Sequence, residues 1–503
     1  MSGVGRDDAD PSANPARWLE FLAVLAIGLG IVARFAARPG APFWLDEAQT
    51  GAILAQPSFA AFLRLTYREV SSPLYFLVMR PWADVFGLSN VALRAPSIIF
   101  GIATPLVVAF ARIPGLTRAE RLCWAALIAL WIPGVGFAQD ARCYALLLLL
   151  ATLQTLAFVR VMRQPGLRAA VIWVGLSSLT VATHYDAAVL ALAQGVIYVA
   201  VHRGAALKTW PAALLGIPVV AIIAWQGPEM ARYMQPGSTW YKVQRPDMLL
   251  SDIWYSFGSV LWLLFLPLFL AVFGFLGSRR RDPSRSAIGA EFGWAAIAAL
   301  SGVVVLLAAA AMRPIFTFRY LTPFEPGLML GLILLVRAVA KSERRIAYGC
   351  LMVFASAACA FWLSSGALHG DSVVESLNYE TASSRLMASD ARSVVVAWDN
   401  PAARMMRDED LAAFGGFFFQ RAGRSTEIIP VRLGLTDDPN IVLPRIASRS
   451  GASILWIYDT WVDGTTASRF PPRFAQLAGA GRCEDLGKAN VGIVVCIPTS
   501  AQR

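Results

Sequence analysis

The chain has 503 residues, of which 57% are hydrophobic and only 15% are charged, and it contains 16 tryptophans. This balance excludes an ordinary soluble domain and indicates an integral membrane protein. The formal net charge of +11 would suit a nucleic-acid binder, but the basic residues fall in short clusters between apolar runs instead of along one stripe or tail. We therefore interpret them as topology signals and expect no nucleic-acid partner.

The amino-terminal end is a polar segment, Met1 to Arg17, followed by the apolar stretch Trp18 to Ala37. This stretch is long for the core of a signal peptide, so we expect an uncleaved membrane anchor. The alternative, a cleaved signal peptide, rests on the short run "AARPGA" directly after it.

Stretches of roughly 17 to 25 mostly apolar residues predict membrane spans, because that length of helix crosses a bilayer. Flanking aromatic residues complete the shorter stretches. Eleven are present, at residues 18–36, 93–112, 121–138, 141–160, 169–183, 186–201, 210–225, 259–277, 290–312, 321–338 and 346–365. Together they predict an α-helical polytopic membrane domain over residues 1–365.

A twelfth apolar segment, "SPLYFLVMRPWADVFG" at residues 72–87, is short and carries Arg80 and Asp84. If it does not cross the membrane, every strongly basic loop falls on one side, which the positive-inside rule makes cytoplasmic. We therefore expect an amphipathic helix along the membrane interface. Only Arg34 and Arg38 then lie on the wrong side. The basic loops are those of Arg112, Arg118, Arg121, Arg160, Arg163, Arg168, Arg203, Lys208, Arg279, Arg280, Arg281, Arg285, Lys341, Arg344 and Arg345.

The same parity places residues 37–92, 226–258 and 313–320 outside, together with the tail after about residue 366. The tail contains the β-branched runs "SVVVAWD", "STEIIPV", "SILWIYD" and "VGIVVCIP", separated by polar, helix-compatible segments. This pattern predicts a small α/β domain outside the membrane over residues 366–503. Cys483 and Cys496 flank a plausible hairpin in an oxidising compartment, which favours a disulfide.

Polar residues gather at the predicted outer ends of the spans. They come from four separate loops: Asp46 and Glu47 in "FWLDEAQTG", Asp140, Arg142 and Tyr144 in "AQDARCYAL", His184 and Tyr185 in "THYDAAV", and Arg319 and Tyr320 in "FTFRYLTP". Charged residues at membrane depth mark substrate pathways or catalytic centres. Each has a simpler alternative: helix capping by the two acids of the first loop, a local ion pair for Asp140 and Arg142, an ordinary interface histidine, and snorkelling of Arg319. Independent snorkelling does not explain acids and bases mixed on one face.

Such a mixture suits transfer chemistry on a phosphate-linked substrate. A carboxylate can act as general base on a hydroxyl, while Arg, His and Tyr can hold a phosphate and stabilise it as a leaving group. Phosphate on a lipid tail arrives at this depth from the bilayer itself. The chain has only three histidines, which argues against a dedicated zinc site. We expect no cofactor, with a divalent cation left open as an alternative.

These residues lie in motifs that resemble the polyprenyl-phosphate-sugar glycosyltransferases of the GT-C class. The resemblance is to the bacterial group similar to lipid A aminoarabinose and galacturonic acid transferases and, more distantly, to the protein O-mannosyltransferases. The motifs follow the family's order along most of residues 43–330. They are "WLDEAQTG", "SPLYFLVMRPWADVFGLSNVALRAPSIIFG", "AQDARCYALLLLLA", "THYDAAVLALAQ" and "RYLTPFEP".

The resemblance implies an inverting glycosyltransferase of the bacterial inner membrane that takes its sugar from undecaprenyl phosphate and acts on the periplasmic side. The acceptor it implies is an envelope glycolipid or polysaccharide. Asp46 matches the family's first-loop acid and so inherits the role of general base. Arg142, His184 and Arg319 match polar or cationic positions around the lipid phosphate. The remaining substrate-binding candidates are Glu47, Asp140, Tyr144, Tyr185 and Tyr320.

The chain departs from the family where a His or Lys commonly comes directly before the "PLY" stretch. It has Ser71, Ser72 and Pro73 there, so we expect cationic help from Arg64 or Arg68. Three other functions stay open: a transporter or flippase of a lipid-linked sugar, a protein O-glycosyltransferase, and a non-enzymatic envelope scaffold. A transporter predicts inverted repeats and polar residues near mid-membrane, whereas no repeat at a fixed period is visible here.

Overall fold

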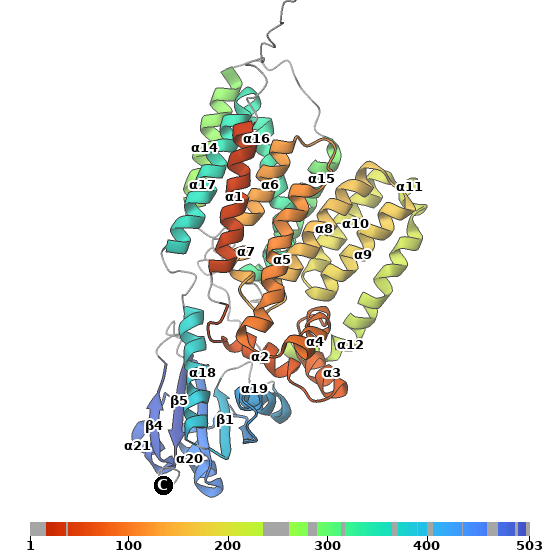
Figure 1. Cartoon of the computed structure of the whole chain (residues 1–503). Helices are drawn as coiled ribbons and strands as arrows, with labels where there is room; N and C mark the ends of the chain where they lie inside the picture. The colour runs from red at the N-terminus through yellow and green to blue at the C-terminus, as the bar shows by residue number, and fades with distance from the viewer. Residues whose placement is uncertain are drawn as a thin grey trace, which may run out of the picture.

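Long apolar helices form a bundle in the computed structural model, and a small sheet lies beyond one end of it (Figure 1). The structure describes residues 17–36, 39–234, 261–279, 289–312, 317–364, 371–389, 391–399, 406–434, 436–459, 471–487 and 491–498. The predictions for residues 1–16, Arg38, most of the loop 226–258, and Arg280, Arg281 and Arg285 therefore lie outside the described residues.

Each of the eleven predicted stretches contains a helix. The helices are α1 (Arg17–Ala36), α5 (Asn90–Phe110), α6 (Arg118–Leu130) with α7 (Ile132–Phe137), α8 (Tyr144–Arg163), α9 (Leu167–Thr183), α10 (Ala187–His202), α12 (Ile217–Tyr233) after the 3-10 turn η1 (Trp210–Gly216), α14 (Leu261–Arg279), α15 (Ala290–Met312), α16 (Glu325–Ala340) and α17 (Arg344–Ser364). Within the described part of the chain, six helical stretches are long and apolar enough to cross a membrane, and three more are apolar but shorter. A multi-pass helical protein is confirmed, and the exact number of spans stays a prediction.

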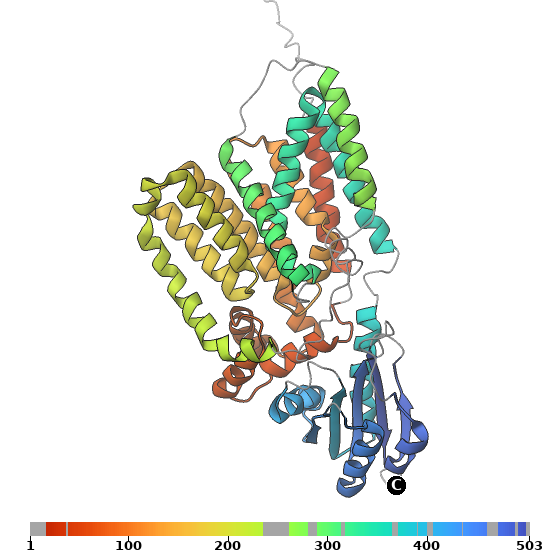
Figure 2. The same cartoon turned by 180° about the vertical axis from the view of Figure 1, so that it is seen from behind.

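The connections that carry basic residues lie at the end of the bundle away from the sheet. This end holds the α5–α6, α8–α9 and α16–α17 connections and the short helix α11 (Gly204–Leu207), as Figures 1 and 2 show. The arrangement agrees with the expected clustering of basic loops on one side of the membrane.

Arg34 lies near the other end of α1, and its contacts explain why it is there. Its guanidinium is fully buried and donates hydrogen bonds to the carbonyl oxygens of Ala129 (2.5 Å) and Ile128 (3.3 Å). These carbonyls belong to the last turn of α6, where the helix lacks partners of its own. Arg34 therefore satisfies a helix end inside the bundle, and the predicted span 121–138 is divided there into α6 and α7.

Three short helices lie at the end of the bundle that faces the sheet (Figures 1 and 2). They are α2 (Leu45–Leu54), α3 (Phe59–Arg68) and α4 (Leu74–Phe86). Helix α4 has 13 residues and is therefore only about 20 Å long, too short for a hydrocarbon core of about 30 Å. Its length fits the interfacial helix expected at residues 72–87.

The carboxy-terminal part is a five-stranded mixed sheet in the order β2-β1-β3-β5-β4. Strands β1 (Ser393–Asp399), β2 (Glu427–Val431) and β3 (Ser453–Asp459) are parallel, and β4 (Arg482–Asp485) and β5 (Val491–Ile497) are antiparallel additions. The α/β expectation is confirmed, and all four predicted runs form strands. Cys483 pairs with Cys496 across β4 and β5 in the expected disulfide.

Side chains alternate between the two faces of this sheet, as strand geometry requires. On one face, α20 (Pro439–Ser450) packs over a core that includes Trp456 and Val494. On the other face, α18 (Asp371–Ala388) and α19 (Asp408–Arg421) pack over Leu455 and Val495. This second core is continuous with the buried side chains of α2 and α4. The sheet domain is therefore joined to the short helices by a shared hydrophobic core.

Candidate active site

Helix α2 holds Asp46 in its first turn. Trp44 caps the helix, and the Glu47 side chain accepts a hydrogen bond from the Trp44 backbone N–H (3.3 Å). Carboxylates in the first turn are favoured by the helix dipole. The capping alternative for the first-loop acids is thus correct for Glu47.

Glu47 has further partners that account for its complete burial. Its Oε1 atom accepts hydrogen bonds from Arg94 Nε (2.7 Å) and from the Ala141 backbone N–H (2.8 Å). Arg94 also donates to the carbonyl oxygens of Ala41 and Pro42, which lie in the segment leading into α2. Glu47 therefore joins α2, α5 and the α7–α8 connection, and its carboxylate exposes no surface to a substrate.

Asp46 differs from Glu47 because its carboxylate is partly exposed. Its Oδ2 atom lies 3.2 Å from Arg319 Nη1, and the two side chains are 37% and 25% exposed. Arg319 belongs to the 3-10 turn η2 (Phe318–Leu321), which lies 273 residues further along the chain. The structure therefore brings together the predicted base and one of the predicted phosphate-binding cations.

Two aromatic rings hold the Arg319 guanidinium in place. Its central carbon lies 4.8 Å from the centre of the Trp44 ring and 5.7 Å from that of Tyr144, distances at which cation–π attraction operates. Burial lowers the pKa of Arg319, but the Tyr144 and Asp46 groups outweigh that effect, so the pKa is raised above its ordinary value. Arg319 is therefore a permanent cation.

Arg142 reaches the same place from the α7–α8 connection. Its Nη1 atom donates to the Asp46 backbone carbonyl (3.4 Å), and its Nη2 atom lies 3.3 Å from Glu69 Oε1. The predicted local ion pair between Asp140 and Arg142 is thus replaced by pairing of Arg142 with the segment after α3. The second predicted cation lies within reach of α2.

Asp140 lies two residues before Arg142, and its pKa responds to the acids and bases around it. Burial and the nearby Glu47 carboxylate raise the pKa of Asp140 to about 7, while the positive charges of Arg319 and Arg94 oppose the shift. This carboxyl group can therefore change its charge near neutral pH.

His184 is next to this cluster through ring contacts. Its ring centre lies 5.9 Å from that of Tyr144 and 5.5 Å from that of Tyr320. Its Nδ1 atom lies 3.2 Å from Asp186 Oδ2. The predicted residues Tyr144, His184 and Tyr320 thus form one aromatic wall beside Arg319.

Besides Glu47, two predicted residues have their polar contacts outside this cluster. Tyr185 donates to Gln226 of α12, whose amide in turn donates to the carbonyl oxygens of Thr66 (2.9 Å) and Glu69 (3.0 Å). Arg68 forms ion pairs with Asp410 (2.7 Å) and Glu409 (3.0 Å) of the sheet domain. Tyr185 and Arg68 therefore hold the end of α3 in place, and their contact with substrate stays a prediction.

Three residues of this region, Arg94, Glu69 and Gln226, were not predicted from the sequence. Arg94 had a usable signal, because it is a charged residue inside the predicted span 93–112 and such residues have partners or a function. Glu69 and Gln226 had none, since their partners are distant in sequence. Among the described residues, no group of three or more His, Cys, Asp and Glu side chains has the arrangement of a metal site.

No family model and no curated protein matches the chain. A solved structure of ArnT from Cupriavidus metallidurans bound to undecaprenyl phosphate aligns over 97% of this chain and 99% of its own, with a TM-score of 0.54 at 12% sequence identity. ArnT in the apo state aligns over 96% of this chain and 98% of its own, with a TM-score of 0.55 at 13% identity.

The chain has the GT-C fold. The alignment covers the bundle and the sheet domain together, so the GT-C likeness extends beyond the five motifs of residues 43–330. At this level of identity the likeness concerns the fold, and the activity must be argued from the site.

Proposed function

We propose that this protein is an inverting glycosyltransferase. In this proposal it moves a sugar from undecaprenyl phosphate to a hydroxyl group of an envelope glycolipid or polysaccharide, on the periplasmic side of the bacterial inner membrane. The observation that carries the proposal is the pairing of a partly exposed carboxylate, Asp46, with the Arg319 guanidinium at 3.2 Å. General base and phosphate-binding cation are the two groups that this transfer requires.

The residues divide the reaction between them. Asp46 takes the proton from the acceptor hydroxyl. The oxygen of that hydroxyl attacks the anomeric carbon from the face opposite the phosphate. The bond from that carbon to the phosphate oxygen breaks, and undecaprenyl phosphate leaves with the bonding electrons. Arg319 and Arg142 stabilise the charge that develops on the departing phosphate, and His184 lies next to them. The proposal needs no metal ion, because the arginines supply the positive charge.

Two features support a lipid-linked donor. The site lies at one end of a bundle of apolar helices (Figure 1), where the phosphate of a membrane-anchored lipid would be found. ArnT, which has the same fold, was solved with undecaprenyl phosphate bound. The acceptor rests on the resemblance alone, so a protein acceptor is the alternative within the same chemistry.

The test compares the envelope glycolipids and polysaccharides of cells with and without the gene by mass spectrometry. We expect one glycan species to lose the mass of a single sugar when the gene is deleted, and to regain it when the wild-type gene is restored. Identical spectra from the two strains would overturn the proposal.

A further inference from the structure

Helix α19 of the sheet domain packs directly against α2, the helix that carries Asp46. Phe417 of α19 is fully buried, and its ring centre lies 6.2 Å from that of Phe43, just before α2. The ring meets α2 at Gly51, where an added Cβ would lie 2.3 Å from Phe417 Cζ. The two helices can approach this closely only because position 51 has no side chain.

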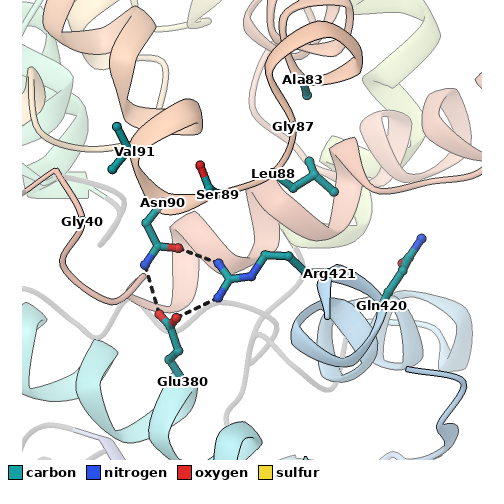
Figure 3. A pocket seen from close by; sticks show the side chains of 10 residues that line it. All are labelled: Gly40, Ala83, Gly87, Leu88, Ser89, Asn90, Val91, Glu380, Gln420 and Arg421. Atoms are coloured by element: carbon teal, nitrogen blue, oxygen red, sulfur yellow. Dashed lines mark hydrogen bonds and ion pairs between the residues drawn. The ribbon is translucent and has the colours of Figure 1, made fainter. Parts of the chain in front are cut away.

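A second contact joins the sheet domain to the segment leading into α2. Arg421 of α19 donates to Asn90 Oδ1 (2.5 Å) and to Glu380 Oε1 of α18 (2.7 Å), and the Asn90 amide donates to Glu380 Oε2 (3.1 Å), as Figure 3 shows. Glu380 Oε2 also accepts a hydrogen bond from the Phe43 backbone N–H (3.3 Å). This network therefore holds the chain three residues before Asp46.

The network borders a cavity of about 800 Å³ between the sheet domain and the bundle (Figure 3). The charged groups in the cavity wall, Arg421 and Glu380, are paired with each other. Their charges are thus already compensated, and the arrangement fits a latch between two parts of the chain better than a site for an ionic ligand.

The third contact joins the sheet domain to the end of α3. Arg68, at the end of α3, pairs with Asp410 at 2.7 Å, and these side chains are only 11% and 8% exposed. The next residue, Glu69, pairs with Arg142. The sheet domain thus holds the segment that orients one of the cations of the site.

We infer that the sheet domain is a positioning element for the active site. The inferred clamp consists of Phe417 against Gly51, the Arg421–Glu380–Asn90 network and the Arg68–Asp410 pair, which fix α2 and its neighbouring segments. The expected effect of the clamp on activity rests on the proposed glycosyl transfer. Its expected effect on the order of α2 is independent of that proposal. The clamp residues act through Asp46 and Arg142 and do not touch the substrate.

The first experiment replaces Phe417 with Leu in the full chain and uses Phe414→Leu as the matched control. Phe414 lies on the same helix and is equally buried, but it stacks on Tyr379 and Trp398 within the sheet domain. Hydrogen exchange of residues 45–54 is measured for both variants in detergent, together with the melting temperature. We expect faster exchange in this segment only for Phe417→Leu. Equal exchange in Phe417→Leu and wild type would overturn the inference.

The second experiment uses steric coupling between the two helices. Ala is a better helix former than Gly, so Gly51→Ala should harm α2 only through its clash with Phe417. We expect Gly51→Ala to lower kcat about 10-fold or more, as displaced catalytic groups do, with the KM for the donor unchanged. The double variant Gly51→Ala/Phe417→Ala should be no worse than Phe417→Ala alone, because removal of the ring relieves the clash.

If the rate losses of the two single variants simply multiply in the double variant, Gly51 and Phe417 act independently. That result would contradict the clamp. The two proposals can fail separately. Absence of transfer by the wild-type protein would refute the glycosyltransferase assignment, whereas unchanged α2 exchange in Phe417→Leu would refute the clamp alone.

Discussion

Asp46 and Arg319 illustrate how much of the site depends on single side chains. The guanidinium of Arg319 is held between Asp46 and two aromatic rings, so its position is fixed before any donor binds. Preorganised charge of this kind lowers the barrier because it needs no rearrangement during the reaction. A donor phosphate that binds Arg319 would also release Asp46 for its role as base.

The first prediction concerns Arg319. Arg319→Gln should lower the rate of transfer about 100-fold, because loss of one preorganised donor in a transition-state site costs roughly that factor. Arg319→Lys should retain part of the rate through its charge, although it lacks the planar fork. Initial rates measure both. Arg118→Gln, in an exposed ion pair with Glu20, is the control and should match wild type. A rate for Arg319→Gln equal to that of the control would contradict the assignment.

The second prediction concerns Asp140 and pH. Its pKa in the folded protein is raised from 3.8 to about 7 by burial and by Glu47, so the folded state binds this proton more tightly than the unfolded state. Stability should therefore fall as pH rises from about 4 to about 7. Asp140→Asn should melt like wild type below about pH 4 and at a higher temperature than wild type at about pH 8. If Asp140→Asn instead melts at a lower temperature than wild type at about pH 8, the ionised carboxylate of Asp140 is stabilising and the prediction is wrong.

For individual residues, the sequence predicted some of the side chains that meet in the candidate site but not all of them. Asp46, Arg142 and Arg319 were predicted to lie together because the parity of the spans places their loops at one end of the bundle. Arg68 has a different partner, since the long side chain at the end of the short helix α3 can turn in several directions and the sequence does not show which. Glu69 and Gln226 were missed because their contacts join segments far apart in the chain.

At the scale of elements, the buried pair of Glu47 and Arg94 fixes α2 to α5. Glu47→Gln should destabilise the protein by about 3–5 kcal/mol, because it leaves a buried arginine without its partner charge. Thermal unfolding of the purified protein measures this loss. Asp408→Ala removes an exposed pair with Arg432 and should change stability by less than about 1 kcal/mol. Similar losses from both variants would argue against a structural role for Glu47.

The elements themselves were largely predictable, since each apolar stretch contains a helix and each β-branched run a strand. The division of residues 121–138 into α6 and α7 had a signal in Pro133, which lies in the first turn of α7 and disfavours a continuous helix. The contact of Arg34 with the carbonyl groups at the end of α6 had none, because it joins two different helices. The strand order β2-β1-β3-β5-β4 was also beyond the sequence, since hydrophobic alternation shows which face is buried and not which strands are neighbours.

For the molecule as a whole, the proposed reaction depends on which end of the bundle faces the periplasm. Basic connections lie at one end, and the site, the disulfide and the sheet domain lie at the other. Impermeant maleimide added to intact spheroplasts should therefore label Ser450→Cys in the sheet domain and leave Arg168→Cys unlabelled, each in a Cys350→Ser background. Both positions are exposed in the structure. The reverse pattern of labelling would place the site on the cytoplasmic side and contradict the proposed reaction.

In the proposed reaction, Asp46 activates an acceptor for attack on a sugar carried by undecaprenyl phosphate. The most direct measurement is release of free undecaprenyl phosphate from lipid-linked sugar by the purified protein, with a membrane extract from the deletion strain as acceptor. We expect one carrier to be released for each sugar transferred by wild type, and neither event with a folded Asp46→Asn variant. Transfer by that variant at the wild-type rate would contradict the account.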